Sequence, residues 1–167
     1  GFRHINTTLG TKHGDIFLKT IAERLQQCIR TEDTVGRWGG DEFMVILADL
    51  AHVEDSARVA NQLLASLRQP LHLGGHELFS PVSIGIALYP LDHIEPEILH
   101  QNAAVAMSKA RDGGCDTYRF YTSDMNARAL ERLALESDLR HALERQEYIV
   151  HYQPQINLQT GAVVGFE

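Results

Sequence analysis

The sequence predicts an α/β protein in which helices flank one mainly antiparallel central sheet. Apolar residues recur at helical spacing in three separate segments, which predicts three amphipathic helices. Short apolar segments joined by Gly-Gly pairs lie between these helices and predict hairpins, because glycine enters tight turns easily. The composition agrees with such a fold: 44% of the 167 residues are hydrophobic and 22% are charged, as in globular domains that bury their own core.

The elements are expected in the order helix, hairpin, helix, hairpin, strand, helix and strand. Asp15 is suited to cap the first helix, and Pro70 stops the second. Gly113 and Gly114 end the third helix. The predicted ranges are a helix over 15–29, a hairpin of 35–38 and 43–47, a helix over 53–67, a hairpin of 71–73 and 76–79, a strand over 82–88, a helix over 96–112 and a strand over 118–121.

One strand carries a further prediction. In the strand over 82–88 one face is made only of the small residues Ser83, Gly85 and Ala87. Small side chains let a neighbour approach the backbone, so we expect a helix to pack closely against this face.

The last part of the chain differs in character. Residues 123–146 predict a long, mostly charged helix that is typical of a connector. Two apolar segments, 148–152 and 162–166, flank a Thr160-Gly161 turn and predict a hairpin of a domain that the sequence does not finish. The expected organisation is therefore a domain over 1–121, a linker helix over 122–146 and a hairpin over 147–167.

Charge and composition exclude several classes of function. The formal net charge is −7, from 15 Lys and Arg against 22 Asp and Glu. Nucleic acid and anionic lipid require a basic face, so we exclude nucleic acid as a partner. Two cysteines without CxxC spacing favour a reducing compartment, and no apolar run approaches the roughly 20 residues of a membrane span. We expect a cytoplasmic location, whether or not the parent protein is membrane-anchored.

The segment most informative about chemistry is the glycine corner between the strands over 35–38 and 43–47. It places the carboxylates of Asp41 and Glu42 directly after Gly39 and Gly40, where a ligand can approach the backbone. Mg²⁺ prefers carboxylate oxygens and is often held by one or two carboxylates together with substrate phosphates. The residues alone leave two interpretations, a magnesium and phosphate site or a solvated acidic turn.

This corner resembles the signature of the GGDEF family, the diguanylate cyclases of bacterial cyclic-di-GMP signalling. Residues 2–6, followed by Leu9-Gly10 and Gly14-Asp15, resemble the family's FKxIND…GH…GD segment. Residues 82–87 resemble its VSIGIA strand. The resemblance covers roughly residues 1–121 in the family's order. It implies a palm-like nucleotidyl-cyclase fold with a ferredoxin-like core.

The resemblance implies that the domain binds GTP and Mg²⁺ and joins two GTP molecules into cyclic-di-GMP, with release of pyrophosphate. Two loaded domains would face each other, so the active form would be a homodimer. Asn6 and Asp15 would bind guanine, since an amide donates and accepts while a carboxylate accepts from N1–H and N2–H. The alternatives are a turn residue at Asn6 and a helix cap at Asp15.

The glycine corner would hold the reacting phosphates. By the resemblance Gly39 and Gly40 would admit the phosphates, Asp41 would be the metal ligand, and Asp41 with Glu42 would be catalytic. Arg111 stands where the family has a phosphate-binding Lys.

A second site is implied just upstream. Arg30 and Asp33 form an RxxD string with five residues between Asp33 and Gly39. It resembles the family's allosteric site, where the product cyclic-di-GMP docks and inhibits. The alternative is a solvated pair of charges at a helix end.

The sequence departs from the family pattern at several positions, Thr7 and Thr11 among them. The departure with the clearest physical consequence is Cys115, which replaces a phosphate-binding Arg. Losing one charge-assisted contact costs about 1.5–3 kcal/mol. Two functions follow as hypotheses: a diguanylate cyclase with weak activity, or a catalytically silent GTP- or cyclic-di-GMP-binding module that regulates an attached phosphodiesterase.

Both ends of the sequence predict a longer parent protein. The family's first strand, with its other metal-binding Asp, is expected upstream of Phe2. Residues 152–156 and 161–167 resemble the opening of an EAL domain, the cyclic-di-GMP phosphodiesterase. The parent is therefore expected to be a composite GGDEF–EAL protein.

Overall fold

The computed structural model describes residues 2–167, and the side chains of 127–133, 136, 143 and 144 lie outside the described part. Two compact units make up the chain, Gly1–Asn126 and Ala127–Glu167. The elements of the first unit are α1 (Phe2–Leu9), α2 (Thr11–Gln27), β1 (Thr34–Gly39), β2 (Glu42–Ile46), α3 (Val53–Leu67), β3 (Leu71–Leu73), β4 (His76–Leu78), β5 (Ser83–Ile86), α4 (Pro96–Asp112) and β6 (Thr117–Phe120). Helix α5 (Ser123–Glu144) begins in this unit.

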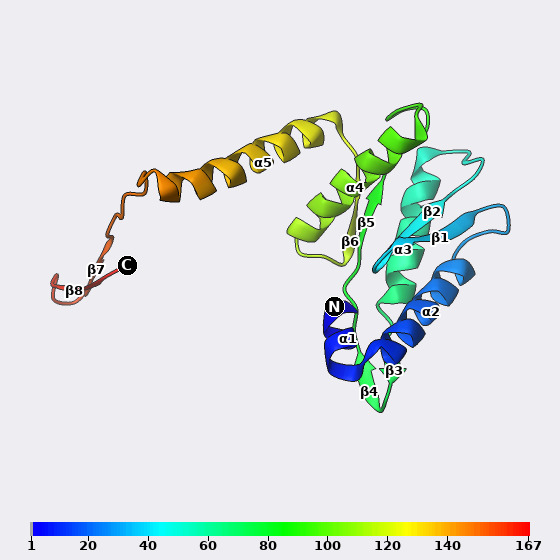
Figure 1. Cartoon of the computed structure of the whole chain (residues 1–167), viewed down its shortest axis with the longest axis horizontal. Coiled ribbons are helices and arrows are strands. Elements are labelled where there is room, and N and C mark those ends of the chain that lie inside the picture. Colours follow the sequence, from blue (N-terminus) through cyan, green and yellow to red (C-terminus); the bar gives the residue numbers. More distant parts are fainter. Residues whose placement is uncertain (1) are drawn as a thin grey trace. The chain divides into compact units, whose positions relative to one another are not determined.

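The predicted α/β class is confirmed, with helices and small, mostly antiparallel ladders. The strands pair two by two: β1 with β2 and β3 with β4 antiparallel, β5 with β6 parallel. The prediction of one central sheet differs from this arrangement, in which the strands form separate two-stranded ladders. Helix α4 lies along β5 and β6, whereas β1 contacts α2. Figure 1 shows α2 and α3 side by side and α4 beside β5.

The core of the first unit lies between α1, α2, α3 and the β3–β4 hairpin. Its buried members are Ile5, Phe17, Leu18, Ile21, Leu25, Leu63, Leu67, Leu71 and Leu73. Helix α2 supplies four of the nine, and three of these, Leu18, Ile21 and Leu25, belong to its predicted apolar stripe. Val35 and Phe43 of the β1–β2 hairpin pack against this cluster. The core therefore fixes one face of that hairpin against α2.

The close approach predicted for the strand over 82–88 is confirmed at Gly85. A Cβ on Gly85 would lie 1.9 Å from the Ala103 carbonyl oxygen and 2.4 Å from the Met107 backbone nitrogen. Both atoms belong to α4. Any side chain at Gly85 would thus push α4 away from β5.

Two boundaries near the N-terminus differ from the prediction. Helix α1 was not expected, because eight residues with two adjacent threonines give little helical signal. The following helix begins at Thr11 rather than at Asp15, with Gly10 as its N-cap. Asp15 is therefore not the cap, since it lies one turn inside α2. Its carboxylate is left available for another role.

The second unit contains the remainder of α5, β7 (Pro154–Ile156) and β8 (Val163–Phe166). The predicted hairpin is present, but the strand expected over 148–152 is wrong. Asn157 fixes the turn, because its Oδ1 accepts the backbone N–H of Gln159 and Thr160. This turn pairs Pro154 with Phe166, so the ladder starts later than the apolar run.

Candidate functional site

The β1–β2 turn carries the two adjacent carboxylates. Gly39 pairs with Glu42, so Gly40 and Asp41 form a two-residue turn. Gly40 has φ +54°, in the left-handed region that glycine enters without strain. The Arg37 guanidinium donates from Nε and Nη2 to the Gly40 carbonyl oxygen, at 3.1 and 2.8 Å. These two bonds fix the turn from within its own strand.

Asp41 and Glu42 offer free oxygens at this turn. Both residues are exposed, and neither side chain has a hydrogen-bond or ion-pair partner among the described residues. In the described part of the chain no three His, Cys, Asp or Glu side chains gather into a complete metal site. A cation here would therefore take further ligands from phosphates and water, which is how proteins commonly hold Mg²⁺. The donor chemistry fits that ion.

A cavity of about 290 Å³ lies where α2 faces the hairpin. Asp15 and Lys19 stand one helical turn apart on α2 and give the cavity two opposite charges. Leu18 and Phe43 give it an apolar wall. An apolar wall with a few polar groups is the usual lining of a site for a flat organic ligand. The full lining is Asp15, Leu18, Lys19, Ala22, Gln26, Val35, Arg37 and Phe43.

Asn6 lies beside the start of the same helix. Its side chain reaches from α1 to Gly14, the residue immediately before Asp15. The structure thus brings together the two residues that the sequence predicts to bind guanine, although Asn6 does not line the cavity. The Oδ1 atom of Asn6 is buried and has no hydrogen-bond partner among the described residues.

Arg30 and Asp33 lie at the turn between α2 and β1. Asp33 accepts the Arg30 backbone N–H on Oδ2 at 2.9 Å and the Ala48 backbone N–H on Oδ1 at 3.0 Å. Its carboxylate therefore ties this turn to the chain beyond β2. The exposed Arg30 guanidinium has a long contact with Glu32, 3.9 Å between Nη1 and Oε1. Arg30 is the member of this pair that is available to a ligand.

Arg111 and Cys115 lie around the end of α4. Cys115 and Asp116 both have positive φ, +61° and +55°, in a turn that starts at Gly114. The Cys115 thiol donates to the Arg111 carbonyl oxygen at 3.7 Å. Arg68 holds the turn, because its guanidinium bonds the Asp116 carboxylate at 2.7 Å and the Asp116 carbonyl at 2.8 Å. This turn supplies no cation at Cys115.

Comparison with known proteins places this arrangement in a family. A family model described as diguanylate cyclase, GGDEF domain, matches residues 1–117. The chain belongs to the GGDEF family. The prediction made from the glycine corner and its neighbouring motifs is therefore confirmed.

Relatives of this GGDEF domain include multidomain bacterial proteins. The chain is 42% identical over 167 residues to the bifunctional diguanylate cyclase/cyclic di-GMP phosphodiesterase MucR of Pseudomonas aeruginosa, covering 100% of this chain and 24% of that protein. The chain spans about a quarter of the length of the curated relatives it matches.

Solved GGDEF domains share its fold. The GGDEF domain of YfiN, also called TpbB, from Pseudomonas aeruginosa is 38% identical, with a TM-score of 0.69 over 72% of this chain and 76% of that one. An EAL/GGDEF domain protein from M. capsulatus is also 38% identical, with a TM-score of 0.69 over 73% of this chain and 79% of that one. These likenesses confirm the palm-like cyclase fold.

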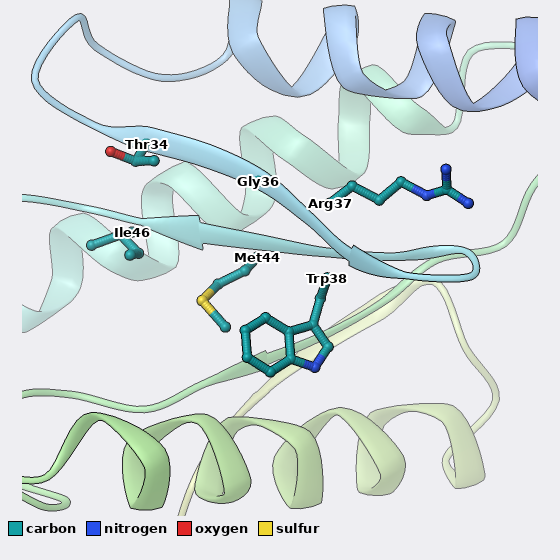
Figure 2. A pocket seen from close by; sticks show the side chains of 6 residues that line it. All are labelled: Thr34, Gly36, Arg37, Trp38, Met44 and Ile46. Carbon is teal, nitrogen blue, oxygen red and sulfur yellow. The ribbon is translucent and has the colours of Figure 1, made fainter.

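The opposite face of the hairpin has a different character. A smaller cavity of about 100 Å³ opens there, and Figure 2 shows Trp38, Met44 and Ile46 around it above α4. The Trp38 indole lies against the His100 imidazole of α4, with 4.3 Å between ring centroids and an angle of 38° between the ring planes. Thr34, Gly36 and Arg37 complete the lining. This cavity lacks carboxylates and is not part of the site described above.

Sequence reasoning missed the supporting residues of the GGDEF site. Lys19 was not singled out, although its place four residues after Asp15 puts both on one face of α2. The bonds from Arg37 to Gly40 were also not expected, because they depend on the turn geometry. Among the described residues, no helix has the length and apolarity that a bilayer span requires.

Proposed function

We propose that residues 1–121 form a GTP- and Mg²⁺-binding domain of the diguanylate-cyclase type. The observation that carries the proposal is the hairpin itself. One turn of it holds the free carboxylates of Asp41 and Glu42, and the same hairpin walls the cavity that Asp15 lines. Phosphate and base sites thus share one rigid element, as a nucleotide requires.

Each residue of the proposed site has its own role in binding GTP. Asp15 accepts hydrogen bonds from the N1–H and N2–H groups of guanine. Gly39 and Gly40 leave the backbone open to phosphates. Asp41 would hold Mg²⁺, which when bound polarises the phosphate and favours ionisation of a hydroxyl. Glu42 would support either the metal or the attacking 3′-hydroxyl. Arg111 adds a positive charge for the phosphates.

The proposed reaction needs two such domains. The 3′-hydroxyl oxygen of each GTP forms a bond to the α-phosphorus of the other GTP. The bond from each α-phosphorus to its bridging oxygen breaks, so two pyrophosphates leave as one cyclic-di-GMP forms. The hydroxyl protons pass to solvent. We therefore expect the active form to be a homodimer, and the protein's work is mainly to position the two nucleotides.

Turnover is the test of this function. The full-length protein is incubated with GTP and Mg²⁺, and pyrophosphate and cyclic-di-GMP are followed together. Formation of two pyrophosphates for each cyclic-di-GMP would support a cyclase. The same incubation with a chelator in place of Mg²⁺ should abolish both products. Pyrophosphate without cyclic-di-GMP would contradict the proposal.

The second candidate function is a silent binding module that regulates an attached EAL phosphodiesterase. Cys115 favours it, because the turn after α4 supplies a thiol where the family has a cation. This module would show no turnover, yet GTP would raise the melting temperature. We propose the EAL attachment because the hairpin of β7 and β8 exposes the large apolar side chains Ile156, Val163, Val164 and Phe166.

We further propose that Arg30 and Asp33 bind cyclic-di-GMP, the ligand implied for the RxxD site. The exposed Arg30 guanidinium would contact a phosphate or the guanine base. Calorimetric titration with cyclic-di-GMP should show about tenfold weaker binding to Arg30→Ala than to the wild type. Equal binding to both would contradict this assignment, and Arg58→Ala is a control because Arg58 pairs only with Asp55 among the described residues.

A further inference from the structure

The contact between Asn6 and Gly14 fixes the residue type at position 14. A Cβ on Gly14 would lie 1.8 Å from Oδ1 of Asn6 and 3.0 Å from its Cγ. Real Cβ atoms essentially never approach another heavy atom within 3.0 Å. Gly14 is buried inside α2 and is not among the glycines with positive φ, so the backbone itself does not demand glycine there. The Asn6 amide does.

This contact also orients the amide. With Oδ1 held against Gly14, the other polar atom of the amide, Nδ2, is the one left for a ligand, since only Oδ1 is buried without a partner among the described residues. Buried polar atoms are nearly always hydrogen-bonded, so an acceptor buried without a partner calls for an explanation. An explanation is that the buried Oδ1 holds the Nδ2 donor of the same amide in a fixed direction. The next residue, Asp15, presents an exposed acceptor and lines the cavity.

We propose that Gly14 is a positioning residue for purine recognition and that it acts through the Asn6 amide. Its missing side chain lets the Asn6 amide sit with Oδ1 against Gly14 and Nδ2 left for a ligand, so that a donor accompanies the Asp15 acceptor. Guanine presents both partners, two N–H donors and the O6, N3 and N7 acceptors. Adenine lacks the adjacent pair of donors that a carboxylate accepts. This inference rests on the proposed GTP binding.

Four variants of the full-length protein test the inference: Gly14→Ala, Asn6→Ala, the double variant, and Gly36→Ala. Gly36 is the matched control, because a Cβ there meets nothing within 4 Å. Melting temperature, GTP affinity and ATP affinity are measured for each. Gly14→Ala should lower the melting temperature and weaken GTP binding about tenfold, by displacing the amide. ATP affinity should stay at the wild-type value, and the control should match the wild type throughout.

The double variant decides between a positioning role and a general loss of structure. Removing the amide relieves the closest contacts of the methyl group and leaves the Phe2 ring at 3.2 Å, so the double variant should melt above Gly14→Ala. Its GTP affinity should equal that of Asn6→Ala, since no amide remains to be displaced. If the losses of GTP affinity measured for Gly14→Ala and for Asn6→Ala instead multiply in the double variant, the inference is overturned. A double variant that melts no higher than Gly14→Ala or fails to fold would also overturn it.

The inference and the proposed function fail in different ways. If the wild type binds GTP and Gly14→Ala binds it equally well, the proposed function stands and the role of Gly14 is wrong. If the wild type binds no GTP, the proposed function is wrong and the recognition role falls with it. The melting temperatures of the four variants still show in that case whether the contact exists.

Discussion

The two faces of the β1–β2 hairpin are built from alternating residues of the same two strands, yet they differ in what they contact. One face carries Val35 and Phe43, which pack on the core, and Arg37, which fixes the turn. The other carries Trp38 and Ile46, which remain 61% and 56% exposed. The packed face belongs to the cavity that Asp15 lines, whereas the open face meets α4 through one aromatic contact. The core packing of the hairpin and the larger cavity therefore lie on the same side of this two-stranded element.

The largest effect is expected where both faces end, at the turn. Asp41→Ala removes the proposed metal ligand and should lower Mg²⁺-dependent turnover at least a hundredfold, since metal charge at the phosphates is worth several kcal/mol. Initial rates of pyrophosphate release measure this. Glu54→Ala, which removes an exposed carboxylate from the first turn of α3, should keep the wild-type rate. Turnover in Asp41→Ala equal to the wild type would remove the metal site from this turn.

The next prediction compares the faces directly. Phe43→Ala takes a half-buried ring from the core side and should destabilise the domain by about 2 kcal/mol. Ile46→Ala truncates a side chain of the open face and should cost less than about 1 kcal/mol. Denaturant melts of the two variants measure both values. A larger loss in Ile46→Ala than in Phe43→Ala would reverse the comparison.

The smallest effect concerns the contact that joins the open face to α4. The Trp38 and His100 rings should contribute about 0.5–1 kcal/mol beyond the area that they bury. A double-mutant cycle of Trp38→Ala and His100→Ala measures this coupling by denaturant unfolding. Additive losses in the double variant would show that the contact between these two rings contributes nothing.

The fold could be predicted where local signals are strong. Helix α3 has the bounds expected from its apolar stripe and from Pro70 beyond its end. The hairpin turn follows from Gly39 and Gly40, and the packing on Gly85 follows from the small face of its strand. Each of these features depends on residues close in sequence or on a single periodic pattern.

Other features depend on tertiary contacts and escaped prediction. Helix α1 is short and is held by packing, since Ile5 enters the core and Phe2 stacks on Phe17. Helix α2 begins at Thr11, before the predicted start at Asp15, because α1 and α2 meet at Gly10. The late start of β7 follows from the turn that Asn157 makes, not from the apolar run before it.

The candidate site shows the same division. The residue types at Asp15, Asp41 and Glu42 could be identified from motifs, because those motifs resemble a known family. What they leave unspecified is the neighbourhood: the cavity that Asp15 shares with Lys19, and the guanidinium that fixes the turn. These depend on how α2 lies against the hairpin, which no single segment encodes.

Arg24 gives α2 a further property. Its guanidinium donates to the carbonyl oxygens of Ser66, Gln69 and Pro70, where α3 ends and the chain turns into β3. Charge-assisted bonds to the end of a helix are among the stronger surface interactions. Arg24 thereby ties α2 to the end of α3 and to the segment that leads into β3, so these two helices and the start of the β3–β4 hairpin are held together by one side chain.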